Sequence, residues 1–240
     1  MKLYRSLVYR ELKLSRKYYA LIGMMLLFLA VSLMIVLILP SAESISADEE
    51  AVLPLDLVSI GIGIIGGFMG VRDGGNYSMD VKTGWARTVY ALPVTGKQMA
   101  CATLMQRLIS LSGAAVINLA YAIAFRAATG FSVFIPLIAI FLICAGAGLI
   151  LDTIYGAVVR MSRDKQQQKK MIVAGNAVVI GFFLLIEKIV GIIFSPSIDV
   201  TKVLKFVQSP VFAVIGVVFF AATALLYYFV ISKSYERREP

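Results

Sequence analysis

The sequence predicts an all-α integral membrane protein with six transmembrane helices and with both termini in the cytoplasm. Hydrophobic residues make up 60% of the 240 residues and charged residues only 15%, whereas soluble domains are about half apolar and about a quarter charged. The apolar residues form runs close to the ~20 residues that a helix needs to cross a hydrocarbon core ~30 Å thick. Lys and Arg gather in short clusters between these runs. Most of the chain is therefore expected to lie in lipid.

Six apolar runs define the predicted spans, so that residues 1–240 form a single transmembrane domain. The spans cover about residues 18–39, 55–71, 98–125, 131–158, 171–188 and 210–232. The second span is short and rich in glycine, and the fifth stops at Glu187 and Lys188. The six apolar residues that follow, 189–194, are too few to cross the membrane alone, so a re-entrant hairpin over residues 189–206, before the last span, is one expected arrangement.

The distribution of basic residues sets the predicted orientation, because loops rich in Lys and Arg resist translocation. With the N-terminus inside, 18 of the 23 Lys and Arg residues lie on the inner side and three on the outer side. This asymmetry predicts cytoplasmic termini, and it places the loop of residues 72–97 in the cytoplasm. In residues 1–17 the apolar side chains recur at helical spacing and basic side chains lie between them, which indicates an interfacial amphipathic helix lying on membrane lipids.

An apolar stripe in the loop of residues 72–97 predicts a cytoplasmic amphipathic helix that ends at Pro93. Its members follow at intervals of four, four, four and three, and they are Tyr77, Val81, Trp85, Val89 and Leu92. Trp85 either anchors a partner protein or rests on lipid headgroups, and the spacing favours neither alternative. Thr95 and Gln98 match a capping box, so the third span is expected to start there.

The glycines of the second span predict close helix packing. Gly61, Gly63 and Gly66 have the spacing of a dinucleotide-binding loop, but that loop must join a strand to a helix in a soluble unit. Within an apolar span, the pairs Gly63/Gly67 and Gly66/Gly70 instead form small-xxx-small spacings that let two helix backbones approach.

No cofactor is expected in this chain. Residues 91–98 nearly match a phosphate-binding loop, but Ala91 stands where the first Gly belongs, and Gln98 where Ser or Thr should ligate magnesium. ATP and Mg²⁺ would therefore be bound by another polypeptide. The chain has no His and only two Cys, which excludes His-dependent hydrolases and the usual metal sites. Its basic residues are not gathered on one soluble face, so no nucleic-acid partner is expected.

Five polar residues inside the spans are candidate structural or substrate-path residues: Arg107, Asn118, Asp152, Asn176 and Glu187. Asp152 is expected to be a partly hydrated helix-end carboxylate or to pair with a basic residue such as Arg107, and a place on a substrate path is the alternative. For the amides and Arg107, joining helices is favoured over ligand binding. Intramembrane aspartyl proteases need a second carboxylate, and the sequence offers no convincing one.

The layout resembles the type-2 permease family of ATP-binding-cassette transporters. The motif runs D-V-K-T-G-W-A-R-T-V-Y-A-L-P-V-T-G-K over residues 80–97, and its Leu-Pro-Val element is the most specific part. The motif covers about 20 residues, and the layout of amphipathic helix and six spans covers the whole chain. Within the family, the chain is most similar to small Gram-positive exporters of amphipathic toxins such as phenol-soluble modulins.

This resemblance implies a multi-pass protein of a bacterial cell membrane in which two permease copies, or two sibling permeases, pair. Each would dock on a separate cytosolic ATPase through residues 77–92, with Trp85 as the anchor. Residues 2–17 would be the elbow helix, and residues 189–206 the outer hairpins. The sequence thus predicts a non-enzymatic permease subunit that exports amphipathic or hydrophobic cargo, peptides above all. The alternatives are a membrane immunity or scaffold protein without transport, and a membrane-embedded enzyme.

Overall fold

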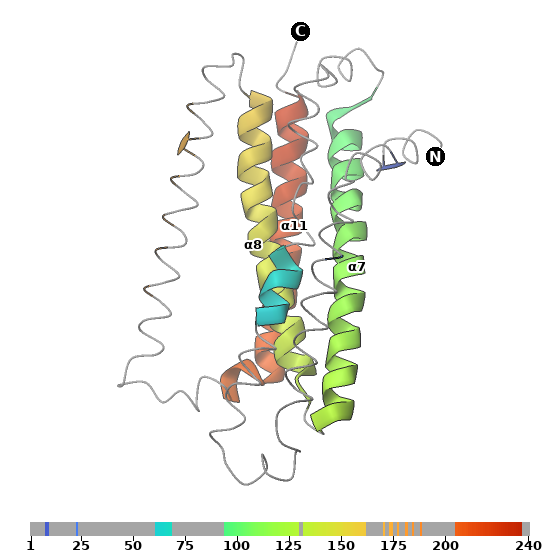
Figure 1. Ribbon diagram of the computed structural model, residues 1–240. Coiled ribbons are helices and arrows are strands. Elements are labelled where there is room, and N and C mark those ends of the chain that lie inside the picture. The colour runs from blue at the N-terminus through green and yellow to red at the C-terminus, as the bar shows by residue number, and fades with distance from the viewer. Residues whose placement is uncertain are drawn as a thin grey trace.

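The computed structural model describes residues 61–68, 94–129, 132–161 and 205–236, together with single helical positions at 8, 9, 23, 170, 173, 174, 177, 181, 184 and 188. This part of the chain is helical and contains no strand. Three long helices dominate it (Figure 1): α7 (Gly96–Thr129), α8 (Phe134–Met161) and α11 (Pro210–Glu236). Each is long and apolar enough to cross a membrane. The all-helical class is confirmed, and three of the predicted spans coincide with these helices.

α7 begins at the predicted capping box. The Thr95 N–H donates to Gln98 Oε1 at 3.0 Å, and the Gln98 N–H donates to Thr95 Oγ1 at 3.3 Å. Two amides that have no partner within the helix are thereby satisfied. The helix continues to Thr129, so its 34 residues exceed the predicted 98–125 at both ends. At 1.5 Å per residue it is about 50 Å long, which is more than a hydrocarbon core requires.

α8 and α11 also start at local signals. α8 begins three residues after the predicted boundary, and its first turn holds Pro136, where a missing N–H costs little. α11 starts with Pro210, a favoured first helical residue, and the preceding Ser209 Oγ accepts a hydrogen bond from the Phe212 N–H at 3.3 Å. Both helices run three or four residues beyond the predicted ends, because the helix does not stop where the apolar run does.

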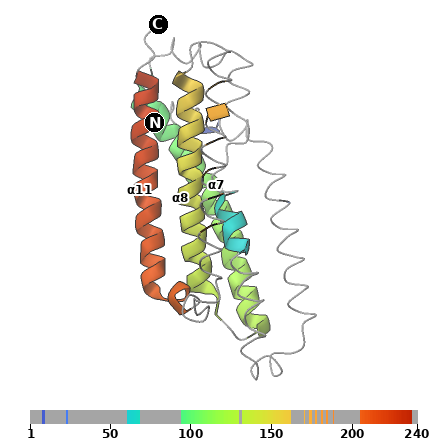
Figure 2. The same cartoon turned by 90° about the vertical axis from the view of Figure 1, so that its left-hand side faces the viewer.

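α8 and α11 lie side by side and run in the same direction, with small residues where they touch (Figures 1 and 2). A Cβ on Gly216 of α11 would lie 2.9 Å from the carbonyl oxygen of Ala139. Further along, a Cβ on Gly146 of α8 would lie 2.8 Å from the ring of Phe219. The two glycines therefore let the helices approach at two successive levels.

α7 runs opposite to this pair. Its first residue, Gly96, lies against the last turn of α11, where a Cβ would be 2.9 Å from the Ser232 carbonyl oxygen. Buried apolar side chains from all three helices form one core, comprising Ala100, Leu111, Ala114, Phe141, Ala145, Leu149, Tyr227 and Ile231.

The helical segment of residues 61–68 packs against α8 and α7 (Figure 2). A Cβ on Gly67 would lie 2.9 Å from the Ala145 amide nitrogen, and one on Gly63 would lie 3.2 Å from the Leu137 carbonyl oxygen. Gly66 lies against the Asn118 side chain. These contacts advance together along both chains, so the segment runs parallel to α8. Gly70 lies outside the described residues.

Candidate functional site

The polar residues of α7 form one buried face near the end of the bundle where α7 begins, called here the Gly96 end. Thr103, Gln106, Arg107 and Ser110 follow at spacings of three, one and three, which places them on one side of a helix. All four are buried. Asp152 and Thr153 of α8 are also buried at this level. We call these six residues the polar seam.

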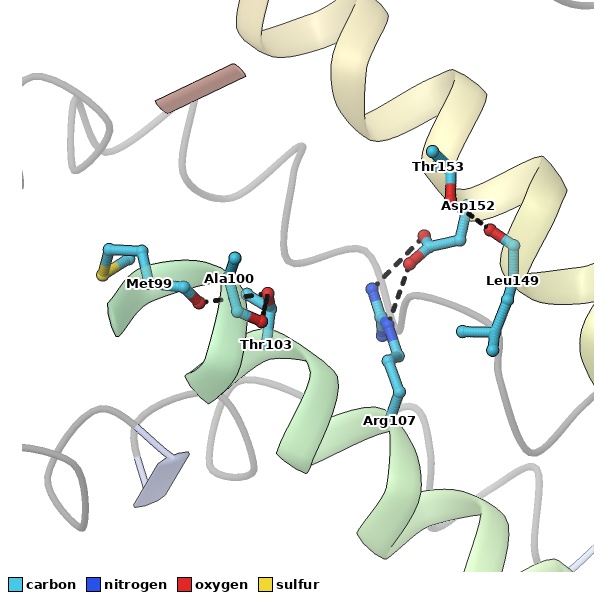
Figure 3. Close-up of polar contacts among 7 residues, drawn as sticks. All are labelled: Met99, Ala100, Thr103, Arg107, Leu149, Asp152 and Thr153. Atoms are coloured by element: carbon cyan, nitrogen blue, oxygen red, sulfur yellow. Dashed lines mark hydrogen bonds and ion pairs between the residues drawn. The ribbon is translucent and has the colours of Figure 1, made fainter. Parts of the chain in front are cut away.

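An ion pair between two helices lies at the centre of the polar seam (Figure 3). Arg107 Nε lies 3.0 Å from Asp152 Oδ2, and Arg107 Nη2 donates to Asp152 Oδ1 at 3.3 Å. The two side chains are only 4% and 7% exposed. They are the two buried charged residues among the described positions. Removing one partner of such a pair leaves an uncompensated buried charge, at a cost of about 3–5 kcal/mol.

The two threonine hydroxyl groups of the polar seam bond within their own helices (Figure 3). Thr103 Oγ1 donates to the carbonyl oxygens of Met99 and Ala100, at 3.1 and 3.0 Å. Thr153 Oγ1 donates to the Leu149 carbonyl oxygen at 2.7 Å. Back-bonds of this kind satisfy a hydroxyl in an apolar surrounding without a partner on another helix. The Arg107–Asp152 ion pair is the contact of the seam that joins α7 to α8 in Figure 3.

Asn118 lies about three helical turns beyond Arg107 on the same face of α7. Its Nδ2 donates to the Ala114 carbonyl oxygen at 2.9 Å, and the amide packs on Gly66. Within the described ranges, its Oδ1 has no hydrogen-bond partner. The amide therefore takes part in the contact between α7 and the 61–68 segment by packing against Gly66.

A second junction brings segments that are far apart in sequence to the Gly96 end. Met99 and Ala102 of α7 are buried there under Val8, Val94 and Tyr235. Val8 belongs to the predicted interfacial helix, Val94 closes the loop of residues 72–97, and Tyr235 lies in the last turn of α11. We call these five residues the end junction. It joins three regions that the sequence assigned to the cytoplasmic side.

Some of the predicted site residues lie together in the structure, and others lie outside the described residues. Arg107 and Asp152 meet, and Asn118 meets Gly66. The predicted docking residues, together with Asn176 and Glu187, lie outside the described residues. Sequence reasoning missed the end junction and the full extent of the polar seam. The spacing of Thr103, Arg107 and Ser110 on one helical face was the available signal for the seam.

The chemistry open to the polar seam is limited. Both carboxylate oxygens of Asp152 are engaged by one guanidinium group. Within the described ranges, no group of three His, Cys, Asp or Glu side chains lies together as a metal site would require. The arrangement is suited to holding two helices in one relative position.

Comparison of the chain with protein-family models, with curated proteins and with solved structures finds no match.

Proposed function

We propose that this chain is the permease subunit of an ATP-driven exporter that moves amphipathic or hydrophobic cargo, such as peptides, out of the cytoplasm or the inner leaflet. A separate cytosolic ATPase subunit would bind ATP and Mg²⁺, and a second permease copy or sibling would complete the pathway. The observation that carries the proposal is the end junction, which packs Val94 against α7 and α11.

The end junction is suited to receiving force from the loop of residues 72–97. Val94 is directly connected to that loop and packs on the cluster of Met99 and Ala102 near the start of α7, against which Tyr235 near the end of α11 also packs. A displacement of the loop would therefore act on two long helices at once. Val8, from the proposed elbow helix, packs on the same cluster and would move with them.

The helix directions support the six-span topology on which the proposal rests. The 61–68 segment, α8 and α11 run one way and α7 runs the other. The proposed second, third, fourth and sixth spans require these same directions. Because α8 and α11 are parallel, the chain between them must cross back once, and the proposed fifth span over residues 171–188 would do so.

The charge inside the described helices supports the proposed cargo class. The buried charges in the described helices are Arg107 and Asp152, which neutralise each other. A path for a small hydrophilic ion would need charged groups or water along the whole membrane depth. Helices with apolar walls and a short polar stretch fit cargo that is itself partly apolar.

Co-purification tests the proposal. Tagged full-length chain is isolated from its native membrane in mild detergent, as wild type and as Trp85→Ala, and bound proteins are identified by mass spectrometry. We expect a polypeptide with nucleotide-binding motifs and ATPase activity in the wild-type sample and its loss in Trp85→Ala. Phe229→Ala, which removes an exposed aromatic ring from α11 within the membrane, is the matched control and should retain the ATPase.

An intact complex without any ATPase would contradict the proposal. A non-transporting immunity or scaffold protein would give that result, and its protective effect would persist without ATP. A membrane-embedded enzyme would show turnover in the purified chain alone.

A further inference from the structure

The contact between α7 and α8 differs in kind from the other helix contacts. Each of these helices packs mainly on α11, and their own backbones approach one another at few places. Arg107 extends its long side chain across the space between them to reach Asp152 (Figure 3). The ion pair therefore joins two helices that otherwise make few direct backbone contacts.

We propose that Arg107 and Asp152 form a reversible latch that holds α7 against α8 at the Gly96 end. When the latch opens, α7 separates from α8 beside the ion pair while it stays packed on α11, and water enters along the polar seam. The inference goes beyond the proposed function, because it concerns a motion of this chain alone.

The composition of the polar seam makes its opening less costly than the opening of an apolar seam. The hydroxyls of Thr103 and Thr153 keep their hydrogen bonds when the helices separate, because those bonds lie within each helix. Arg107 and Asp152 exchange each other for water, which compensates both charges. An apolar seam would instead expose hydrocarbon surface to water.

The position of the latch also favours access of water. At 1.5 Å per residue, Arg107 lies about 16 Å along α7 from Gly96, so the seam is close to one end of the bundle. The opposite face of α7 is apolar and exposed, with Met105, Leu108 and Ile109 at this level. Opening therefore concerns the buried face of the helix alone.

The consequence for cargo rests on the proposed function. An amphipathic peptide that enters from the Gly96 end would meet a guanidinium group and a carboxylate that no longer bind each other. The open latch offers each of them to a peptide group of opposite charge, beside an apolar wall. A purely hydrocarbon cargo would gain nothing from the opening.

Thiol labelling in lipid nanodiscs tests the latch without an ATPase or cargo. Cys101 and Cys144 are replaced by Ser, and the buried Ser110 of the seam is replaced by Cys. The labelling rate with N-ethylmaleimide then reports how often water and reagent reach the seam. Ser112→Cys is the matched control, because Ser112 lies two residues away on the exposed face of α7.

Arg107→Gln or Asp152→Asn should accelerate labelling at position 110 by about tenfold or more and leave position 112 unchanged, because loss of one partner strongly favours the open state. The charge swap Arg107→Asp with Asp152→Arg should restore a rate within about threefold of the wild type, since the pair is rebuilt in reverse. The double variant Arg107→Leu with Asp152→Leu should label more slowly than the wild type, because its seam no longer accepts water.

Three results would overturn the latch. They are unchanged labelling at position 110 in both single variants, an equal rise at position 112, and a Leu–Leu variant that labels as fast as the wild type. If the single variants do not fold, the labelling rates of the charge swap and of the Leu–Leu variant test the latch, because replacement of both partners is usually tolerated. A failed co-purification leaves this assay unaffected, so the two proposals fail separately.

Discussion

The α8–α11 pair and the α7–α8 pair are held together by different kinds of contact. α8 and α11 meet through Gly216, which lies against the Ala139 backbone, and through Gly146, which lies against the Phe219 ring, so that an added Cβ at either position would overlap a neighbour. α7 and α8 meet through the long side chain of Arg107, which crosses the space between them to reach Asp152. Lipid gives little hydrophobic advantage to either contact, so packing and polar bonds decide both. The first contact depends on shape at many atoms, and the second on one ion pair.

The largest loss in the free energy of unfolding is expected when one partner of the ion pair is replaced and the other is kept. Arg107→Leu is expected to lower the free energy of unfolding by about 3–5 kcal/mol, because the buried Asp152 carboxylate loses the guanidinium group that neutralises its charge. Unfolding with increasing sodium dodecyl sulfate, followed by circular dichroism, measures the change. The double variant Arg107→Leu with Asp152→Leu should recover most of the loss. A double variant as unstable as the two losses combined would show that the residues act independently.

Substitution in the glycine contact should lower the free energy of unfolding by less than loss of the ion pair, whereas the control substitution should raise it. Gly216→Ala is expected to cost about 1–3 kcal/mol, because the Cβ would lie 2.9 Å from the Ala139 carbonyl oxygen, which belongs to the backbone. Gly61→Ala is the control, since no atom lies within 4 Å of its Cβ position. There the better helix propensity of Ala should stabilise by up to about 1 kcal/mol. Equal effects at both positions would remove the close approach as the explanation.

The start of α7 should be sensitive to its cap. Thr95→Ala removes the hydroxyl that accepts the Gln98 N–H and should cost about 1 kcal/mol. Hydrogen exchange of the first-turn amides of α7 should rise, while amides near Asn118 stay protected. Thr95→Ser keeps the hydroxyl and is the control. Equal protection in the Ala and Ser variants would mean that the cap does not stabilise this end.

The smallest effect is expected on the exposed face of α7. Ser112→Ala removes a hydroxyl that donates to the Ile109 carbonyl oxygen of its own helix at 2.7 Å. Its expected effect on the free energy of unfolding is within about 0.5 kcal/mol. A loss several times larger would show that this face is covered by protein and does not face lipid, and would place a partner on it.

The sequence predicted those parts of the fold that depend on local signals. Long apolar runs located α7, α8 and α11, and the spacing of Thr95 and Gln98 located the first residue of α7. The helix ends were misplaced by a few residues, since a helix continues for as long as its backbone bonds are satisfied. Hydropathy responds to the lipid boundary and carries no signal for that continuation.

The site was only partly predictable because its contacts join residues that are distant in sequence. Arg107 and Asp152 stood out as charges within apolar runs, and pairing was one expected arrangement. Nothing in the sequence indicated that Tyr235 would pack beside Val94 and Val8, since that contact depends on how α11 ends relative to α7. The sequence also did not indicate that the hydroxyls of Thr103 and Thr153 bond to carbonyl oxygens of their own helices, because buried polar residues of this kind can equally line a binding site.

The parallel arrangement of α8 and α11 has a consequence for how the protein is made. α8 is synthesised well before its main packing partner, and the chain from Met161 to Glu236 takes on the order of ten seconds to translate at typical rates. During that interval the glycine-lined face of α8 has no α11 to meet. Arg107 and Asp152 are both already in the membrane, and by pairing they would keep a newly inserted hairpin of α7 and α8 together until the last helix arrives.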